Sequence, residues 1–514
     1  MAQINTQSVI GVIGAGIMGR GIAQVASKAG HKVLLYDQDG EAVKNSLVIT
    51  GKDLAKLVAK GKIEESKRTQ ALELIVPCFE FDNLASCDIV IEAIVENLQI
   101  KKEIFAKLQQ LNKEMIIASN TSSISISSLA NGLDKPENIL GIHFFNPAPI
   151  MKLVEIIYGL QTDEVIRQEV YDLVASWGKV CVLVKSSPGF IVNRIARPFY
   201  AESMRLVEEG VSDFASLDES LKNSGSFRMG PFELMDLIGN DTNYSVTKSM
   251  YDSYYSDPRF KPSVLQYEYV CAGLLGRKAS RGFYDYKEGS DVVSANYIKP
   301  QLAIDASQEE IVVYGDLGIG SHLLDLFKQT NIIITRHAKS EIFSLSGYIE
   351  YNDIILYIAN GKMATEFSKT DNLHNIVQLD ICLDFRATKS LTIAPSLLAS
   401  KECQTKIASL FQIIDKKTIC IKDSPAMVTL RTIAMLANEA SSTVTSQVCD
   451  QKSADEAMKY GVNYKIGPFE WIDYLGNDYI LNTLNELEDF YKDGRYRADR
   501  GLIHNHYTKE KYGQ

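Results

Sequence analysis

The stretch Gly14-Ala15-Gly16-Ile17-Met18-Gly19 decides the fold of the amino-terminal part of the chain. It follows a short β-branched apolar run, residues 9–13, and precedes a helical pattern of small residues over residues 22–29. In this strand–turn–helix context the first glycine permits a tight turn, and the second lets a pyrophosphate approach the backbone. The third glycine lets helix and strand pack closely. The stretch therefore predicts a dinucleotide-binding βαβ unit.

An acidic residue, Asp37, ends the predicted second strand, residues 32–36. A carboxylate at this position can bind the ribose hydroxyls of an adenosine and would repel a 2′-phosphate. The sequence therefore favours NAD over NADP. A flexible glycine turn without a ligand is the alternative, and the agreement of strand, glycines, helix and acid argues against it.

The composition is that of a globular protein with several domains. The 514 residues are 46% hydrophobic and 23% charged, and the chain is too long for a single core. No apolar run is long enough for a membrane span, and the first residues lack the pattern of a signal peptide. The formal charge of −10 argues against a nucleic-acid partner, and the eight cysteines form no CxxC pair, so no metal site is expected. These features favour the cytoplasm.

Polar clusters follow two further predicted strands. Residues 88–95 are followed by Glu96 and Asn97, and residues 115–119 are followed by the polar residues 120–123. Because ligands of open α/β sheets bind outside the carboxyl ends of the strands, both clusters are expected at a site.

Lysine and arginine gather in a predicted helical stretch, residues 52–68. Such a run is most often a solvated helix face. The alternative is a landing surface for an anionic substrate tail.

His143 and Glu155 are the candidate acid–base pair. Each lies six residues from Pro149, in the strand-like runs 139–145 and 152–157. A hairpin closed near that proline would place the two side chains opposite each other. A carboxylate beside an imidazole fixes its tautomer and stabilises its protonated form, as a base that removes an alcohol proton requires. A strand-end histidine with an unrelated surface glutamate fits the spacing about equally well.

Residues 8–286 resemble the L-3-hydroxyacyl-CoA dehydrogenases over their whole two-domain length. The segments that carry the resemblance are residues 11–19, 92–97, 118–123, 143–147, 188–194 and 229–234. The full length is similar to bacterial forms with an extended carboxyl-terminal half. These include the 3-hydroxyadipyl-CoA dehydrogenases of phenylacetate degradation and some 3-hydroxybutyryl-CoA dehydrogenases. The resemblance implies NAD-dependent oxidation of a 3-hydroxyacyl-CoA, in phenylacetate catabolism or in fatty-acid metabolism.

The resemblance also implies roles for individual residues. His143 would be the catalytic base and Glu155 its electrostatic partner. Ser122 and Asn193 would hold the substrate oxygen and the histidine. The positions implied to line the cofactor are Gly14, Ala15, Gly16, Ile17, Met18, Gly19, Asp37, Glu96, Lys101, Ser122, Asn146 and Lys278. The positions implied to lie near the acyl-CoA substrate are Lys60, Lys101 and Ser122.

The second half of the chain is a diverged copy of the first. At an offset of 237 positions and without gaps, the Gly-Pro-Phe-Glu of residues 230–233 recurs at residues 467–470, and the Gly-Asn-Asp of residues 239–241 recurs at residues 476–478. Asn193 maps to Leu430, so the copy lacks that side chain.

The segments before this copy also echo the first half. The glycines of residues 315–320 follow GxxGxG rather than GxGxxG, and residues 352–358 are similar to the strand that begins at Asp88. Residues 376–385 contain Asp and Cys where a histidine is needed. We therefore expect a Rossmann-like domain without a working site.

The resemblance and the repeat together give the expected domain order. A Rossmann NAD-binding domain over residues 1–185 is followed by an all-α domain of the 6-phosphogluconate-dehydrogenase type over residues 186–286 and by a linker over residues 287–307. A degenerate Rossmann-like domain over residues 308–420 and a second, non-catalytic helical domain over residues 421–514 complete the chain. The two helical domains are expected to form an internal pseudo-dimer, which leaves another surface available for a homodimer.

Two other functions compete with this interpretation. One is a non-catalytic NAD-binding protein on the same scaffold, which the joint presence of His143, Glu155, Ser122 and Asn193 argues against. The other is a dehydrogenase of small free hydroxy acids, which would show no preference for the coenzyme A thioester.

Overall fold

The computed structural model describes residues 4–509 except residues 6, 291–292 and 301–303. The chain forms two compact units. Unit one consists of Met1–Arg194 and Ser446–Val462, and unit two consists of Ile195–Thr445 and Asn463–Gln514. No helix among the described residues is long and apolar enough to cross a membrane.

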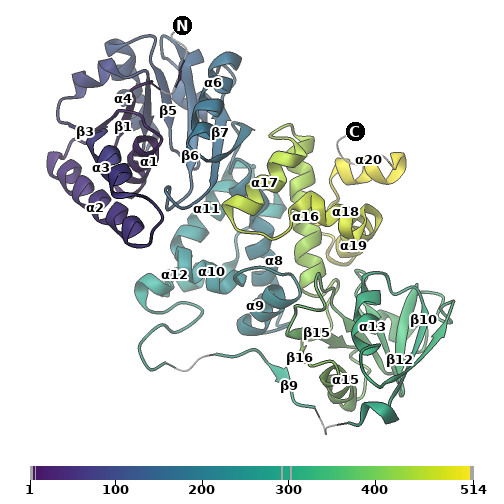
Figure 1. Ribbon diagram of the computed structural model, residues 1–514. Coiled ribbons are helices and arrows are strands. Elements are labelled where there is room, and N and C mark those ends of the chain that lie inside the picture. The colour runs from purple at the N-terminus through teal and green to yellow at the C-terminus, as the bar shows by residue number, and fades with distance from the viewer. Residues whose placement is uncertain (1–3, 6, 291–292, 301–303, 510–514) are drawn as a thin grey trace. The chain divides into compact units, whose positions relative to one another are not determined.

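Unit one is built on an eight-stranded sheet in the order β3-β2-β1-β4-β5-β6-β7-β8 (Figure 1). The first six strands in this order are parallel, whereas β7 and β8 run in the opposite direction. The bounds are β1 Ile10–Ile13, β2 Val33–Tyr36, β3 Ile75–Cys78, β4 Ile89–Glu92, β5 Ile116–Ser119, β6 Ile139–Phe144, β7 Leu153–Tyr158 and β8 Val180–Lys185. The parallel part confirms the predicted Rossmann-type domain.

The helices of unit one begin where the sequence supplies capping residues. Asp39, Asn97 and Asp163 accept backbone N–H groups at the amino-terminal ends of α2, α4 and α6. The bounds are α1 Ile17–Lys28, α2 Gly40–Ala59, α3 Glu65–Glu73, α4 Leu98–Leu111, α5 Ile126–Ala130, α6 Glu164–Ser176 and, at the boundary of the unit, α7 Val192–Ile195. Apolar side chains of α1, α6 and the strands form one core, which includes Ile22, Val170 and Ile91.

One further helix of unit one comes from the second half of the chain. Helix α17, Gln451–Gly461, packs against β7 and β8 through its small and apolar side chains. Residues 446–462 therefore belong to unit one, although the sequence assigned all of residues 421–514 to the second helical domain. The apolar spacing within α17 predicts a buried face, but not which sheet that face covers.

Unit two contains a second eight-stranded sheet, in the order β11-β10-β12-β13-β14-β15-β16-β9. It differs from the first sheet at its third strand, because β12 runs antiparallel to both of its neighbours. The bounds are β9 Tyr297–Ile298, β10 Glu310–Gly315, β11 Ile333–His337, β12 Gly347–Tyr351, β13 Ile354–Ile358, β14 Ile376–Leu379, β15 Ser390–Pro395 and β16 Lys417–Cys420.

Two expectations for this sheet need correction. The predicted linker, residues 287–307, contributes strand β9, whose Tyr297 and Ile298 pair with β16 at the sheet edge. The sequence similarity of residues 352–358 to the strand that begins at Asp88 predicts that the two strands are equivalent. However, β13 pairs with β14 in the second sheet as β5 pairs with β6 in the first, so β13 is the equivalent of β5. The antiparallel strand β12 then occupies the position of β4. Both errors arise because short apolar runs specify a strand but not its neighbour.

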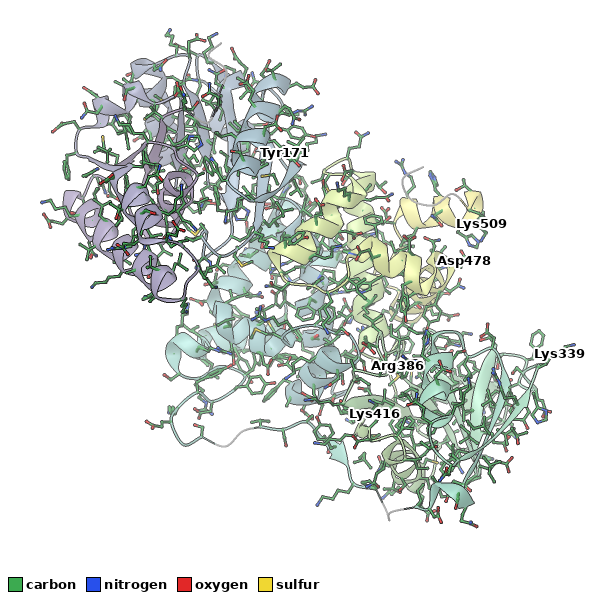
Figure 2. All side chains as sticks on the ribbon, viewed as in Figure 1. Tyr171, Lys339, Arg386, Lys416, Asp478 and Lys509 are labelled. Atoms are coloured by element: carbon green, nitrogen blue, oxygen red, sulfur yellow. The ribbon has the colours of Figure 1, made fainter. Side chains whose placement is uncertain are left out.

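The helices of unit two come from both copies. The bounds are α8 Arg197–Glu208, α9 Phe214–Asn223, α10 Pro231–Ile238, α11 Asn240–Ser253, α12 Val264–Cys271, α13 Ser321–Phe327, α14 Ala364–Thr370, α15 Glu402–Gln412, α16 Thr429–Thr445, α18 Pro468–Leu475, α19 Asn477–Tyr491 and α20 Arg500–Thr508. Asp478 at the start of α19 pairs with Lys509 at 2.9 Å, which ties down the end of α20 (Figure 2).

Helices α8 and α16, which are repeat equivalents, pack against each other in unit two. At their contact Arg431 Nε lies 2.9 Å from Glu202 Oε2, and both side chains are fully buried. Tyr496 donates a further hydrogen bond to Glu202 at 2.8 Å. The expected packing of the first helical copy against the second is therefore confirmed for these elements, and the contact includes a fully buried ion pair.

Candidate active site

The hairpin of β6 and β7 places His143 opposite Glu155. His143 Nδ1 lies 2.7 Å from Glu155 Oε2, and both residues are buried. The expectation from the spacing around Pro149 is confirmed, because the strand register pairs these two positions directly. Phe145 and Phe190 lie against the imidazole, with ring centroids 4.5 and 5.9 Å away, and restrict its orientation.

The second carboxylate oxygen of Glu155 is also engaged. Glu155 Oε1 accepts the backbone N–H groups of Ile191 at 3.0 Å and Val192 at 3.1 Å, where α7 begins. Both oxygens thus have fixed partners, so the carboxylate can hold the imidazole in one orientation and one tautomer. Asn193 follows in the first turn of α7, on the backbone that Glu155 binds. The sequence could not reveal this link between β7 and α7.

The glycine loop lies at the same edge of the sheet, after β1. A Cβ on Gly14, whose φ is +101°, would lie 2.7 Å from the carbonyl oxygen of Ala93, and one on Gly19 would lie 1.8 Å from that of Gly14. No atom lies within 4 Å of a Cβ on Gly16, so this position is open to a ligand. Helix α1 begins at the next residue and presents unpaired N–H groups there. The loop therefore fits a dinucleotide pyrophosphate.

Asp37 has a structural role that the sequence did not reveal. Its Oδ2 accepts the backbone N–H of Ala15 at 2.7 Å, and its Oδ1 accepts that of Asp39 at 3.0 Å. The Asp37 carboxylate, directly after β2, thus stabilises the conformation of the glycine loop through a hydrogen bond.

A second polar cluster forms around Glu96, between the ends of β4 and β5. Its Oε1 accepts hydrogen bonds from the Thr121 hydroxyl at 2.5 Å and from the Ser122 backbone N–H at 3.1 Å. Burial alone would raise the pKa of Glu96, but the hydrogen bond from Thr121 and the charge of Lys101 hold it below its ordinary value. Glu96 is therefore ionised and fixes the loop that carries Ser122.

The Lys101 side chain is buried, so it does not present its ammonium group at the protein surface. Its Nζ lies 2.6 Å from Glu92 Oε1 and 3.3 Å from Glu96 Oε2, and its side chain is 1% exposed. Glu92, which the sequence analysis did not single out, also accepts the Ser119 hydroxyl at 2.7 Å. Lys101 is therefore held by a buried ion pair with Glu92 and positions Glu96, whose side chain is 37% exposed.

The other candidate residues lie on separate loops and helices. Asn146 is exposed in the loop between β6 and β7, and Lys60 is exposed at the end of α2. Lys278 belongs to unit two, where its Nζ lies 2.6 Å from Asp241 Oδ1. Ile17 and Met18 form the first turn of α1, and Ile17 is 65% exposed.

Residues of the second half reach the same region of unit one. Arg194, within α7, donates to the Ser446 hydroxyl at 3.0 Å. A Cβ on Gly461 would lie 2.7 Å from Leu153 Cδ2 and 3.0 Å from Val192 Cγ2. The carboxyl-terminal copy therefore packs against the strand and the helix start that hold Glu155.

The second copy has no histidine–glutamate pair at the positions equivalent to His143 and Glu155. At the offset of 237 positions, Asp380 replaces His143 and Thr392 replaces Glu155. The Asp380 carboxylate accepts four backbone N–H groups, those of Ile381, Val428, Thr429 and Leu430, at 2.7 to 3.2 Å. An aspartate occupied in this way cannot act as a proton acceptor for a substrate. Within the described part of the chain no group of histidine, cysteine and acidic side chains could hold a metal ion.

A parallel sheet with an open glycine loop and a buried His–Glu pair at its carboxyl edge defines a dinucleotide-dependent dehydrogenase. Residues 9–187 match the model of the 3-hydroxyacyl-CoA dehydrogenase NAD-binding domain. Residues 189–286 and 427–514 match the carboxyl-terminal domain of that family, and residues 356–425 match the 3-hydroxybutyryl-CoA dehydrogenase reduced Rossmann-fold domain. The chain belongs to the 3-hydroxyacyl-CoA dehydrogenase family.

Relatives match over the whole chain and over its first half. A 3-hydroxyadipyl-CoA dehydrogenase of Escherichia coli is 36% identical over 96% of this chain and 96% of its own length. A 3-hydroxybutyryl-CoA dehydrogenase of Bradyrhizobium diazoefficiens is 43% identical over 55% of this chain and 97% of its own. The crystal structure of a 3-hydroxybutyryl-CoA dehydrogenase from Escherichia coli superposes with a TM-score of 0.86 at 34% identity, covering 98% of this chain and 99% of that one.

Proposed function

We propose that this protein oxidises the 3-hydroxyl group of an (S)-3-hydroxyacyl-CoA to the 3-oxo group with NAD, with His143 as the general base. The observation that carries the proposal is the 2.7 Å contact between His143 Nδ1 and Glu155 Oε2. With Nδ1 engaged, Nε2 is the ring nitrogen that takes the hydroxyl proton. The carboxylate then offsets the positive charge that appears on the ring.

The glycine loop and α1 hold the cofactor in this proposal, which fits the open position at Gly16. When bound, NAD supplies the hydride acceptor for C3 of the substrate. Asp37 selects NAD over NADP, because its carboxylate repels a 2′-phosphate. Glu96 holds the Ser122 loop in place, and Lys101 acts through Glu96. We infer that Asn146 and Lys278 line the cofactor.

Ser122 and Asn193 are proposed to bind the substrate oxygen and to orient His143. Their backbones are fixed by Glu96 and Glu155 respectively, since each carboxylate accepts N–H groups of the same loop or helix start. Lys60 is the proposed contact for the coenzyme A moiety.

Two acyl groups compete as the natural substrate, because the full-length relatives carry the names 3-hydroxyadipyl-CoA and 3-hydroxybutyryl-CoA dehydrogenase. Rates with 3-oxoadipyl-CoA, acetoacetyl-CoA and free acetoacetate, measured with NADH, separate these substrates. Equal activity on free acetoacetate would instead indicate a dehydrogenase of small hydroxy acids.

The decisive experiment replaces the base. His143→Ala is expected to lower kcat by about 10²–10⁴-fold, the usual range for loss of a general base, with NADH affinity nearly unchanged. His337→Ala, which removes an exposed histidine of unit two, is the matched control and should retain full turnover. Most of the wild-type turnover remaining in His143→Ala would exclude His143 as the base.

A further inference from the structure

A single ammonium group holds the loop that joins the two strands of the candidate active site. Lys179, in the turn between α6 and β8, donates from Nζ to the carbonyl oxygens of Ala148 at 2.5 Å and Met151 at 2.8 Å. Both carbonyls belong to the loop between β6, which carries His143, and β7, which carries Glu155. Lys179 therefore fixes the connection between the two strands that pair the base with its carboxylate.

The same loop packs against the helix that follows the glycine loop. A Cβ on Gly21 of α1 would lie 3.1 Å from Pro149 Cδ and 3.2 Å from Ala148 Cβ, so helix and loop are in close contact. Phe145, at the start of the loop, lies against the imidazole of His143. A displacement of the loop would therefore affect both the imidazole and α1, the helix at whose start the cofactor pyrophosphate is expected.

The second copy has an equivalent pair of hydrogen bonds. At the offset of 237 positions Lys416 replaces Lys179. Lys416 Nζ donates to the carbonyl oxygens of Arg386 at 3.2 Å and Thr388 at 2.6 Å (Figure 2). This loop, residues 383–389, bonds to the end of α9, whereas the loop of the first copy packs against α1. The contact is therefore common to both hairpins, but the two loops pack against different helices.

The charge of Lys179 can change within the range in which enzymes are assayed. Burial lowers the pKa of Lys179 to about 8, and the positive charge of Lys28, in the last turn of α1, acts in the same direction. Cys181 of β8 acts in the opposite direction. Hydrogen bonds from a charged donor are roughly twice as strong as neutral ones. Lys179 therefore holds the loop most strongly below about pH 8.

We propose that Lys179 is a positioning residue for the cofactor: its ammonium group holds the loop after β6 against α1, and loss of its charge weakens NADH binding. The inference rests on the proposed dehydrogenase function, in which α1 and the glycine loop hold the dinucleotide. Because binding and protonation are reciprocally linked, NADH that binds best to the charged form must take up a proton when it binds above about pH 8. A lysine that only stabilised the fold would not couple NADH binding to a proton.

The test measures NADH binding to the full-length protein by calorimetry at about pH 7 and about pH 9, in buffers of different ionisation enthalpy. The wild type should bind about twofold to tenfold more weakly at the higher pH, with proton uptake there. Lys179→Arg, which keeps its charge at both pH values, should lose this pH dependence. Lys179→Met should bind NADH about tenfold more weakly at both pH values. Its kcat at saturating NADH should change less than its affinity.

Lys416→Met is the matched control, because it removes the equivalent two hydrogen bonds from the second copy. It should lower the free energy of unfolding, as Lys179→Met does, but leave NADH affinity and its pH dependence unchanged. The proposal is wrong if folded Lys179→Met binds NADH as the wild type does, or if Lys416→Met weakens binding equally. Wild-type pH dependence in Lys179→Arg would overturn it as well. Since the test measures binding, absence of turnover with a 3-hydroxyacyl-CoA would contradict the proposed function and not this coupling.

Discussion

The backbone N–H of Lys185 donates to the carbonyl oxygen of Val448 at 2.8 Å, which joins the end of β8 to the second half of the chain in unit one. In unit two its repeat equivalent, the N–H of Lys422, donates to the carbonyl oxygen of Val211 at 3.0 Å. Helix α17 follows Val448 and covers β7 and β8, and helix α9 follows Val211 and packs against β15. Each half of the repeat therefore contributes one helix that packs against the sheet of the other half.

A substitution at Gly461 tests whether helix α17 stabilises β7, the strand that carries Glu155. Gly461→Leu should destabilise the protein by about 1–3 kcal/mol, the usual cost of overpacking, because a side chain would push against Leu153 and Val192. Since Glu155 binds the N–H of Val192, turnover should fall as well. The measurements are urea unfolding and kcat.

Gly51 provides the matched control for this experiment. Gly51 lies within helix α2 of the same unit. A Cβ at Gly51 would meet only Leu72 Cδ1 of helix α3, at 4.0 Å. Gly51→Leu should leave stability and turnover nearly unchanged. Equal effects of the two substitutions would contradict a specific role for the contact of α17.

Asp37 should affect both cofactor choice and loop stability. Asp37→Ala is expected to narrow the preference for NADH over NADPH, because the carboxylate that repels the 2′-phosphate is gone. It should also weaken binding of both cofactors, because the N–H of Ala15 loses its acceptor. Asp37→Asn, which keeps an acceptor without the charge, should narrow the preference with less loss of affinity. A wild-type enzyme that already prefers NADPH would refute the assignment.

Lys101 is expected to act through Glu96. Lys101→Met removes the ammonium group beside two carboxylates, so the buried Glu92 would lose its partner and would face the like charge of Glu96. The loss of one partner of a buried ion pair typically costs about 3–5 kcal/mol. Lys101→Met/Glu92→Gln should recover much of this stability. A stable single variant with an unchanged KM for NADH would show that the ion pair does not hold the Ser122 loop.

Asp380 makes stability depend on pH. Burial raises its pKa to about 6, although hydrogen bonds from Thr429, Leu430 and Val428 act in the opposite direction. Because the folded-state value lies above the unfolded value of about 3.9, Asp380 favours the folded state at low pH and this contribution is lost as the pH rises from about 4 to 6. Asp380→Asn should therefore reduce the fall in unfolding free energy between pH 4 and pH 6. Parallel pH profiles for variant and wild type would contradict it.

Deletion of residues 308–514 should expose the faces that α16 and α17 cover. We expect the truncated protein to dimerise or aggregate, since α8 would lose Arg431 and β7 would lose its covering helix. The intact chain should bind one NADH, because the glycines of residues 315–320 do not follow the GxGxxG pattern of the first half. Sedimentation and NADH titration provide the readouts. A well-behaved monomeric truncation of full stability, or two equivalent NADH per chain, would refute the idea of an internal pseudo-dimer.

The His143–Glu155 pair could be predicted from the sequence because a short hairpin leaves few registers. The ion pair of Lys101 with Glu92 could not, since it joins a helix to a strand end with no fixed spacing between them. Likewise, the apolar spacing of α17 predicts a buried face but does not specify which of the two sheets that face covers. The pairing of β9 with β16 rests on two residues, too few for a recognisable strand pattern.

The exchange of α9 and α17 has a consequence for how the protein is made. The ribosome releases the amino-terminal half first, yet the segment that covers β7 ends only at Val462. At typical rates of synthesis the newly made sheet waits roughly 15 to 50 seconds for that segment. During this interval its apolar surface is open to chaperones, and to α9 of the same nascent chain as an incorrect substitute. The protein acquires its active form only when translation is nearly complete.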